Sequence, residues 1–358
     1  MTKPFYKCDP FNFVPLSRTP WAGKQISDLK KNYFSKETNR IPNLIGESWE
    51  VSTDGQFPSK IKNEKNELVG LSDLLKLNPK FILGQESYGK YGSHFPLLLK
   101  WLEANDTLSV QLHPSNSNAR LKQNECGKPE AWLVLNAEEG SFVYLGFKEG
   151  LSQEEIIENL RNDEAEKCLH KYTPNKFDFI SVPPGCVHAV GPGVLLAEPQ
   201  YVLPEKIGKT WRISDWKRLY SEDGKLSPLG KPRELHVEDS FSSINWSLPR
   251  GVNLEQLLIK KMHSQDEFLG DKNNPFALKI YCGSAKGKEE YTHAQLLPYT
   301  FSIFTVWAGQ ATLSSGSDVL SLSGGESGFI CAEAKNVKVT LEENGCIAFF
   351  SLNDQFCF

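Results

Sequence analysis

The chain has 358 residues with a formal net charge of −4, and 39% of them are hydrophobic while 23% are charged. These values are ordinary for a globular protein. Basic residues do not cluster as contact with nucleic-acid phosphates requires, so we expect no nucleic-acid partner. No apolar run approaches the roughly 20 residues that span a membrane, and the start, MTKPFYKCDPFNF, lacks the apolar stretch of a signal peptide. We therefore expect a cytoplasmic protein with no membrane contact.

Eight cysteines are scattered along the chain, and none forms a Cys-x-x-Cys pair. This spacing does not indicate a cysteine zinc site or a thioredoxin-type motif. Scattered single cysteines in a chain of this length are typical of reduced thiols in the cytoplasm. The sequence thus predicts free thiols.

In chain order, turn signals interrupt the first hundred residues, and strands dominate afterwards. Residues 46–52 (GESWEVS) and 94–102 (HFPLLLKWL) are typical of strands, and residues 68–79 have helical spacing. The clearest helix is predicted at residues 152–170, because Ser152 begins a capping-box pattern. Further strands are expected within residues 107–113, 130–136, 177–200 and 210–216.

A polar stretch that is rich in turn residues, EDGKLSPLGKPRE, interrupts the chain after these strands. We place a domain boundary there, which predicts a first domain at residues 1–225 and a second at residues 226–358. Short strands separated by Gly and Ser turns recur after residue 250, and this spacing is typical of a sandwich or barrel. The sequence therefore predicts a mainly β protein.

Four polar residues in or beside these strands suggest a metal site. Gln111 and His113 lie two positions apart in the alternating strand TLSVQLH, so both side chains leave the same face. Glu130 opens the next strand, and the tight turn of PPGCVH aims His188 inward. Two imidazoles and a carboxylate, with an amide oxygen as a weak fourth ligand, suit a divalent ion such as zinc. A single histidine in a strand is more often a satisfied core or surface group, so the set carries more weight than any member.

Several separated segments resemble one known family in the right order. They are FPLLLKWLEANDTLSVQLHPSN, GKPEAWLVL, VPPGCVHAVGPGVLLAEPQ and TWRISDWKR, preceded by RTPWAGKQISD and IGESWEVS. These segments are similar to type I mannose-6-phosphate isomerases, in the cupin superfamily. The resemblance runs over residues 14–218 and more loosely beyond. It implies two cupin-type jelly-roll barrels with a small helical element, and the first barrel would hold the active site.

The resemblance implies an aldose–ketose isomerase that interconverts mannose 6-phosphate and fructose 6-phosphate. The family's zinc ligands match Gln111, His113, Glu130 and His188, which implies one Zn²⁺ per chain. The family's active-site arginine matches Arg212 in WRISDW. Moving a proton between C1 and C2 needs a Lewis acid for the developing negative charge and a base for the proton.

Lys128 is one candidate for that base. It lies two residues before Glu130, so on an extended segment both side chains point to the same side, and a nearby cation would lower the pKa of the lysine. A solvated surface charge is the alternative reading. Glu198 and His94 are the other candidates for the base.

The remaining predicted site residues contact the substrate. Arg212 is always charged, so it suits stabilisation of an oxyanion or contact with a phosphate; without the family, an ion pair with Asp215 would be favoured. Ser109 lies on the ligand face of its strand, and we predict that it binds substrate together with Glu198. The expected partner is a small sugar phosphate, with the protein a monomer or homodimer.

Two alternatives remain at this point. The chain could be another metal cupin enzyme, such as a dioxygenase or a different sugar-phosphate isomerase, or a non-catalytic sugar-binding cupin that keeps a structural metal. Glu130 follows His113 by 17 residues, which favours the isomerase pattern over an iron oxygenase. The C-terminal domain has no histidine–carboxylate set of its own, and we expect it to support the first domain without a metal site.

Overall fold

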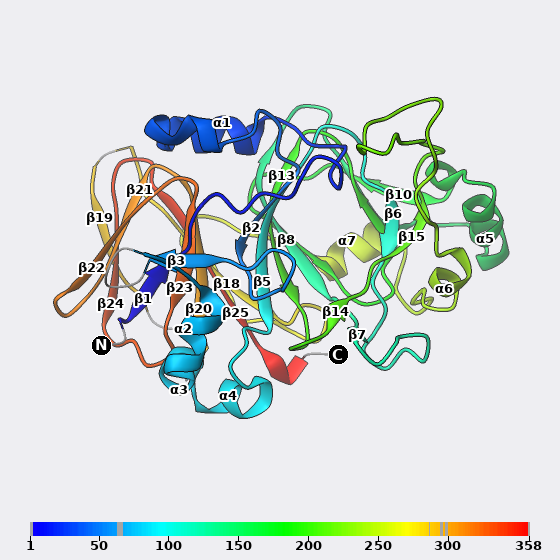
Figure 1. Ribbon diagram of the computed structural model, residues 1–358. Coiled ribbons are helices and arrows are strands. Elements are labelled where there is room, and N and C mark those ends of the chain that lie inside the picture. The colour runs from blue at the N-terminus through cyan, green and yellow to red at the C-terminus, as the bar shows by residue number, and fades with distance from the viewer. Residues whose placement is uncertain (1–2, 63–66, 286, 294–295, 298–299, 357–358) are drawn as a thin grey trace.

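The computed structural model describes residues 3–62, 67–285, 287–293, 296–297 and 300–356. Within these residues the chain is mainly β, as predicted, and its strands form four large sheets and two small strand pairs (Figure 1). Two of the large sheets lie in each half of the molecule. The small pairs are β14 (Ile207–Gly208) with β7 (Glu125–Cys126), and β3 (Lys60–Lys62) with β4 (Leu68–Gly70).

The first half holds a six-stranded and a five-stranded sheet. The six-stranded sheet has the order β16 (Ile259–Lys261), β11 (Asp178–Val182), β8 (Glu130–Ala137), β13 (Val194–Tyr201), β5 (Leu97–Ala104) and β2 (Glu47–Val51). The five-stranded sheet has the order β10 (Leu169–Tyr172), β9 (Val143–Phe147), β12 (His188–Val190), β6 (Val110–Leu112) and β15 (Trp211–Ser214).

The second half repeats this plan with a six-stranded and a four-stranded sheet. The six-stranded sheet has the order β1 (Phe5–Lys7), β23 (Glu326–Ile330), β20 (Ser302–Ala308), β25 (Cys346–Leu352), β18 (Phe276–Cys282) and β17 (Glu267–Phe268). The four-stranded sheet has the order β19 (Glu289–His293), β24 (Val337–Leu341), β21 (Gln310–Ser315) and β22 (Asp318–Ser323).

The two six-stranded sheets pack against each other and form the largest core. Alternate residues of β5 and β8, such as Leu99 and Leu133, share this core with Ile280 and Ile303 of the second half. The intervening residues, such as Trp132, face the five-stranded sheet instead. The first six-stranded sheet is therefore buried on both faces, which explains why all eight residues of β5 are buried.

Two strands cross the predicted domain division at residue 225. β16 lies beyond that division, yet it pairs with β11 of the first half. β1 lies near the start of the chain, yet it pairs with β23, and Figure 1 shows this blue strand among the orange and red strands of the second half. We propose that the second β-domain consists of β1 together with the strands that follow β16.

The described helices are short and lie around the sheets. They are α1 (Gln25–Tyr33), α2 (Leu71–Leu77), α3 (Pro79–Leu83), α4 (Gln85–Tyr91), α5 (Gln153–Arg161), α6 (Val237–Phe241) and α7 (Val252–Leu258), with 3₁₀ turns at Ser35–Arg40, Ala165–Lys167 and Asp354–Phe356. Within the described residues no helix has the length and apolar character needed to cross a membrane.

The helix predicted at residues 152–170 begins as expected but ends early. Ser152 and Glu155 form the predicted capping box. The helix stops at Arg161, because Asp163 has a φ of 55°, a left-handed conformation that cannot continue a right-handed helix. His170 consequently lies on strand β10, where its Nε2 is 2.6 Å from Glu255 Oε1, and not at the end of a helix.

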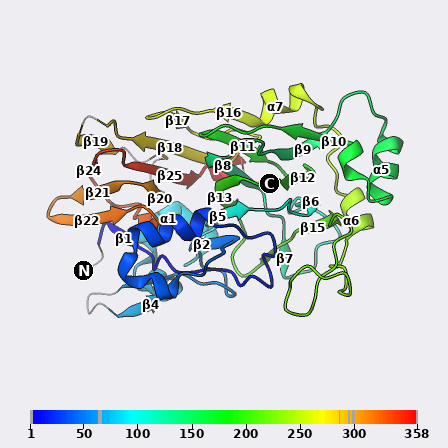
Figure 2. The same cartoon turned by 90° about the horizontal axis from the view of Figure 1, so that it is seen from above.

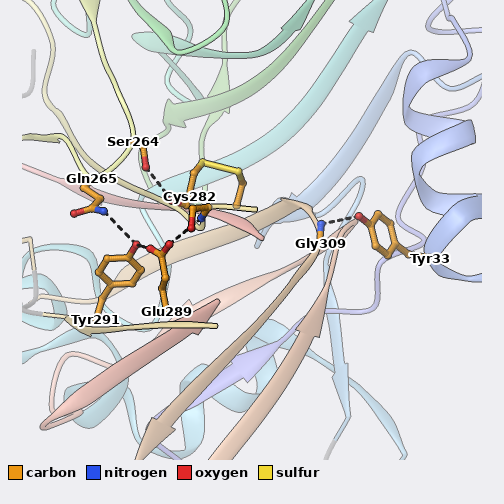
Figure 3. The surroundings of a disulfide bond; sticks show 9 residues. Tyr33, Ser264, Gln265, Cys282, Glu289, Tyr291 and Gly309 are labelled. Atoms are coloured by element: carbon orange, nitrogen blue, oxygen red, sulfur yellow. Dashed lines mark hydrogen bonds between the residues drawn. A yellow bond between two sulfur atoms is a disulfide. The ribbon is translucent and has the colours of Figure 1, made fainter. Parts of the chain in front are cut away.

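Helix α1 crosses the junction between the two halves (Figure 2). The backbone N–H of Ile26 donates to Glu103 Oε2 of the first half at 2.9 Å. The hydroxyl of Tyr33 accepts from the backbone N–H of Gly309 in the second half at 2.6 Å (Figure 3). Both ends of the helix are thus fixed, each to a different half.

The prediction that all cysteines are free thiols is wrong for one pair. Cys282 on β18 and Cys346 on β25 form a disulfide (Figure 3). The two residues are 64 positions apart in the chain, but they are directly opposite in the antiparallel register of these strands. Sequence spacing does not reveal this pairing, because it depends on how two distant strands meet.

A buried ion pair lies where α1 meets the two six-stranded sheets. Lys30 Nζ is 2.7 Å from Glu50 Oε1, and both side chains are almost completely buried. Lys30 also donates to the carbonyls of Pro10 and Gly325. Glu50 accepts from Ser327 of the second half at 2.8 Å. Each charge is therefore compensated by hydrogen bonds from both halves, which is the condition under which a buried pair is tolerated.

Lys30→Met should destabilise the protein, because it leaves the Glu50 carboxylate buried without its cation. We expect a loss of about 3–5 kcal/mol in the free energy of unfolding, measured by denaturant titration. Lys338→Met is the matched control, since Lys338 pairs with Glu290 at the surface and both are more than half exposed; its loss should stay below about 1 kcal/mol. Equal losses in the two variants would contradict a special role for the buried pair.

Candidate metal centre

One face of the five-stranded sheet carries polar side chains at the same level of three neighbouring strands. Gln111 on β6 is opposite His188 on β12 and opposite Arg212 on β15. Directly opposed residues of antiparallel strands share a face. The row is possible because β6, β12 and β15, which are distant in the sequence, become neighbours in the sheet.

The facing six-stranded sheet contributes Glu130, at the start of β8. Its Oε2 is 3.1 Å from His113 Nε2, and its Oε1 is 3.4 Å from His188 Nε2. The ligand atoms of these three residues all lie within 4.8 Å of one another, and all three residues are buried. The amide of Gln111 is at the edge of this cluster, with Nε2 3.4 Å from His188 Nε2. The four residues that the sequence analysis predicted as ligands are therefore together.

Both histidines are oriented by the backbone. Nδ1 of His113 is 3.0 Å from the carbonyl of Lys209, and Nδ1 of His188 is 2.9 Å from the carbonyl of Cys186. A carbonyl only accepts, so each Nδ1 carries the proton and each Nε2 presents a lone pair to the cluster. This arrangement is the usual one for metal-bound histidine.

The protonation of these histidines also fits a cation site. Burial lowers the pKa of His113 and lowers that of His188 to about 4, so both rings are neutral at pH 7. Nε2 of His113 is buried and, among the described residues, has no partner with hydrogen-bond geometry, although Glu130 is close. A buried lone pair without a donor is costly, and a cation would satisfy it.

The charge of Glu130 is held in place by its neighbours. Burial alone would raise its pKa, but Lys128 and the two histidines outweigh burial and hold the pKa well below the usual range. Nζ of Lys128 is 3.1 Å from Glu130 Oε2. Burial would lower the pKa of Lys128, yet the charges of Glu130 and Glu198 raise it. The lowering expected from the sequence depends on a bound cation beside the lysine, and it stays a prediction.

Further polar side chains line the same face of the six-stranded sheet. Glu198 accepts from Trp132 Nε1 at 3.2 Å and from Gln200 Nε2 at 2.7 Å. Burial, followed by the charge of Glu130, raises the pKa of Glu198 to about 8. Glu198 therefore carries a proton at pH 7, whereas Glu130 is ionised, so the two carboxyl groups differ in protonation.

Sequence reasoning missed three residues of this lining: Glu47, Lys100 and Gln200. Nζ of Lys100 is 3.4 Å from Glu47 Oε2 and 4.3 Å from the centre of the Trp49 ring. One signal was present, since Lys100 interrupts an apolar run that was predicted to be a buried strand. A charged residue inside such a strand needs a partner, but the sequence did not indicate which one.

Arg212 lies beside this cluster and is not the partner of Asp215. Asp215 is bound by Arg218 and Arg233, at 2.7 and 2.6 Å. The Nη1 of Arg212 donates to the carbonyl of Glu234 at 2.9 Å, and its Nε is buried with no hydrogen-bond partner in the described part of the chain. The guanidinium therefore keeps donor capacity, since no carboxylate of the described residues forms an ion pair with it.

The two other candidates from the sequence occupy different places. Ser109 is buried directly before β6, two positions from Gln111. His94 lines a separate small cavity of about 50 Å³ with Asp54 and Lys206. None of the four predicted ligands lines that cavity. The structure thus places Lys128 and Glu198 near Glu130 but leaves His94 in a separate cavity.

Comparisons with known proteins find similar sequences and similar structures. Residues 20–138 match the phosphomannose isomerase type I catalytic domain. A mannose-6-phosphate isomerase of Streptococcus mutans is 29% identical over 306 residues, which cover 86% of this chain and 87% of that protein. The crystal structure of the mannose 6-phosphate isomerase from Bacillus subtilis superposes with a TM-score of 0.71 at 21% identity, covering 98% of this chain and all of that one.

A zinc-bound mannose 6-phosphate isomerase has the same fold, with a TM-score of 0.67 at 15% identity over 98% of this chain and all of that one. These likenesses confirm the cupin-type fold that the sequence predicted. They extend along nearly the whole chain and therefore include both halves of the molecule. Together with the matched catalytic domain, they show that this chain is similar to type I phosphomannose isomerases in sequence and in fold.

Proposed function

We propose that the chain is a metal-dependent isomerase that interconverts mannose 6-phosphate and fructose 6-phosphate, with one zinc ion per chain. The observation that carries this proposal is the buried cluster of His113, Glu130 and His188, in which two neutral imidazole nitrogens and a carboxylate converge. Two imidazoles and one carboxylate form a ligand set that suits zinc. Gln111 is the proposed fourth ligand.

A divalent cation held by these residues would act as a Lewis acid for the negative charge that develops on the sugar oxygens. The protein residues supply the remaining requirements. Nζ of Lys128 is 3.1 Å from Glu130 Oε2, so its ammonium suits donation of a hydrogen bond to an oxyanion, and Lys128 stays a candidate for the base. We propose that Glu198, whose pKa is raised to about 8, takes part in proton transfer, and that it binds the substrate together with Ser109.

Arg212 is the proposed contact for the negatively charged parts of the substrate. It lies on the same face as Gln111, in register with it, and its guanidinium is not neutralised by Asp215. A guanidinium presents a fork of donors that matches phosphate or an oxyanion. This assignment also favours the isomerase over a sugar-binding cupin without catalytic activity, because such a protein needs no free cation beside its metal.

A coupled assay tests the reaction directly. It follows the formation of fructose 6-phosphate from mannose 6-phosphate by the purified protein, before and after treatment with a chelator. Activity should disappear with the chelator and return when zinc is added back. Undiminished turnover after the metal has been removed, with metal content verified by elemental analysis, would contradict a metal-dependent reaction; no turnover by the zinc-loaded protein would contradict the substrate.

His113→Ala should lose both bound zinc and isomerase activity, because it removes one imidazole from a buried three-residue cluster. His170→Ala is the matched control, since His170 pairs with Glu255 away from this cluster. Its metal content and turnover should equal those of the unmodified protein. Metal analysis by mass spectrometry and the coupled assay measure the two effects separately. Retention of a full equivalent of zinc by His113→Ala would exclude this residue as a ligand.

Arg212→Ala should keep its zinc and lose activity. Removing one preorganised cationic donor should lower kcat/KM by about 10²–10³-fold, and Arg212→Lys should restore little, because an ammonium does not replace the guanidinium fork. Arg161→Ala is the control, since Arg161 pairs with Glu238 at the surface and is more than half exposed. Steady-state kinetics of the zinc-loaded variants give the comparison, and a kcat/KM within twofold of the unmodified protein for Arg212→Ala would remove the residue from the site.

A further inference from the structure

Gln200 lies between the two carboxylates of the site and has no assigned role. It is on β13, opposite Glu130 of β8 and two positions after Glu198 on the same strand. Strand alternation places Gln200 and Glu198 on the same face. The side chain is almost completely buried, with 1% exposed. Any hydrogen bond that it makes is therefore shielded from water and strong.

The amide nitrogen of Gln200 connects the two carboxylates. Nε2 donates to Glu130 Oε2 at 3.0 Å and to Glu198 Oε2 at 2.7 Å. An NH₂ group has two hydrogens, so one donor group can serve both acceptors. Among the described residues, the Gln200 amide thus donates a hydrogen bond to each of the two carboxyl groups.

The hydrogen bonds of the amide nitrogen set the orientation of the Gln200 side chain, and its amide oxygen makes none among the described residues. Oε1 of Gln200 is buried and has no hydrogen-bond partner in the described residues. Rotating the amide by 180° would bring Oε1 against the acceptor oxygen of the ionised Glu130 and would remove the hydrogen bond to it. The unpaired oxygen is thus the cost of placing both N–H bonds on Glu130 and Glu198.

The two oxygens of Glu130 consequently have different environments. Oε2 faces the donors Gln200 and Lys128, at 3.0 and 3.1 Å, whereas Oε1 is the oxygen nearer to His188. Lys128 has a long flexible side chain, but Gln200 is held by strand pairing on both sides of β13. The fixed donor of the pair is therefore Gln200.

We propose that Gln200 is a positioning residue that orients the Glu130 carboxylate for metal binding and couples it to Glu198. The inference rests on the proposed metal site, but it concerns zinc affinity and so does not depend on which sugar is isomerised. Hydrogen-bond partners of metal ligands are worth about 10- to 100-fold in metal affinity. The hydrogen bonds of the Gln200 side chain go to Glu130 and Glu198 and not to the imidazole ligands.

The test compares zinc affinity in three variants of the full chain. Gln200→Met keeps the side-chain length and removes the donor, and Gln200→Asn keeps the amide but is too short to reach both acids. Gln25→Met on α1 is the matched control, since Gln25 bonds to Asn136 away from the site. Zinc dissociation constants are measured on metal-free protein by competition with a chromophoric chelator. Thermal unfolding of the same samples, without metal, verifies that each variant is folded.

Both Gln200 variants should bind zinc about 10- to 100-fold more weakly, while Gln25→Met should match the unmodified protein. A folded Gln200→Met with a zinc dissociation constant within twofold of the unmodified value would overturn the proposal; if that variant does not fold, the same result for Gln200→Asn decides. If the unmodified protein binds zinc tightly but does not turn over mannose 6-phosphate, the proposed substrate fails and the zinc comparison still decides the role of Gln200.

Discussion

The burial of the first six-stranded sheet on both faces is the constraint on which the rest of this structure depends. One face of the sheet, with residues such as Leu99 and Leu133, packs on the second half of the molecule. The other face, with Lys100, Glu130 and Glu198, looks toward the five-stranded sheet. A sheet that is covered on one side by a large apolar core is held rigid, and the polar groups on its other side are then held at fixed distances. We infer that packing on the second half stabilises the site.

Placing so many charged groups between two sheets requires that each be compensated. Lys128 lies against Glu130, Lys100 against Glu47, and Glu198 is raised in pKa until it carries a proton at pH 7. These pairings reduce the cost of burying charge, which for an unpaired group would be prohibitive. Nε2 of His113 is the exception, because its lone pair faces the Glu130 carboxylate and has no donor among the described residues, whereas Nε2 of His188 has the Gln111 amide at 3.4 Å. That imbalance is what a cation would correct.

The same principle operates at the junction of the two halves. Lys30 on α1 and Glu50 on β2 are buried together and form an ion pair. Lys30 also donates to the carbonyl of Gly325, and Glu50 accepts from Ser327, both in the second half. The Trp101 side chain continues this polar contact across the two six-stranded sheets by donating to Thr305 at 3.0 Å. Apolar packing alone does not define how one sheet is positioned along the other, whereas directional hydrogen bonds fix the relative position of the two sheets. The position of the site relative to the second half is therefore defined by a few polar contacts within a large apolar interface.

The sequence by itself determined the mainly β architecture, the Gln111 and His113 pair on one strand face, and the family resemblance that pointed to Glu130, His188 and Arg212. These features are local: strand alternation has a period of two, and a turn such as PPGC is specified by its own residues. Only the tertiary structure decided which distant strands are neighbours. It placed His188, Gln111 and Arg212 in one row, paired Arg218 and Arg233 with Asp215, joined Cys282 to Cys346, and brought Glu47, Lys100 and Gln200 to the site. Such contacts arise from pairing between strands that are far apart in the chain. The alternation of polar and apolar residues within a strand does not depend on which strand lies beside it, so it cannot reveal the neighbour.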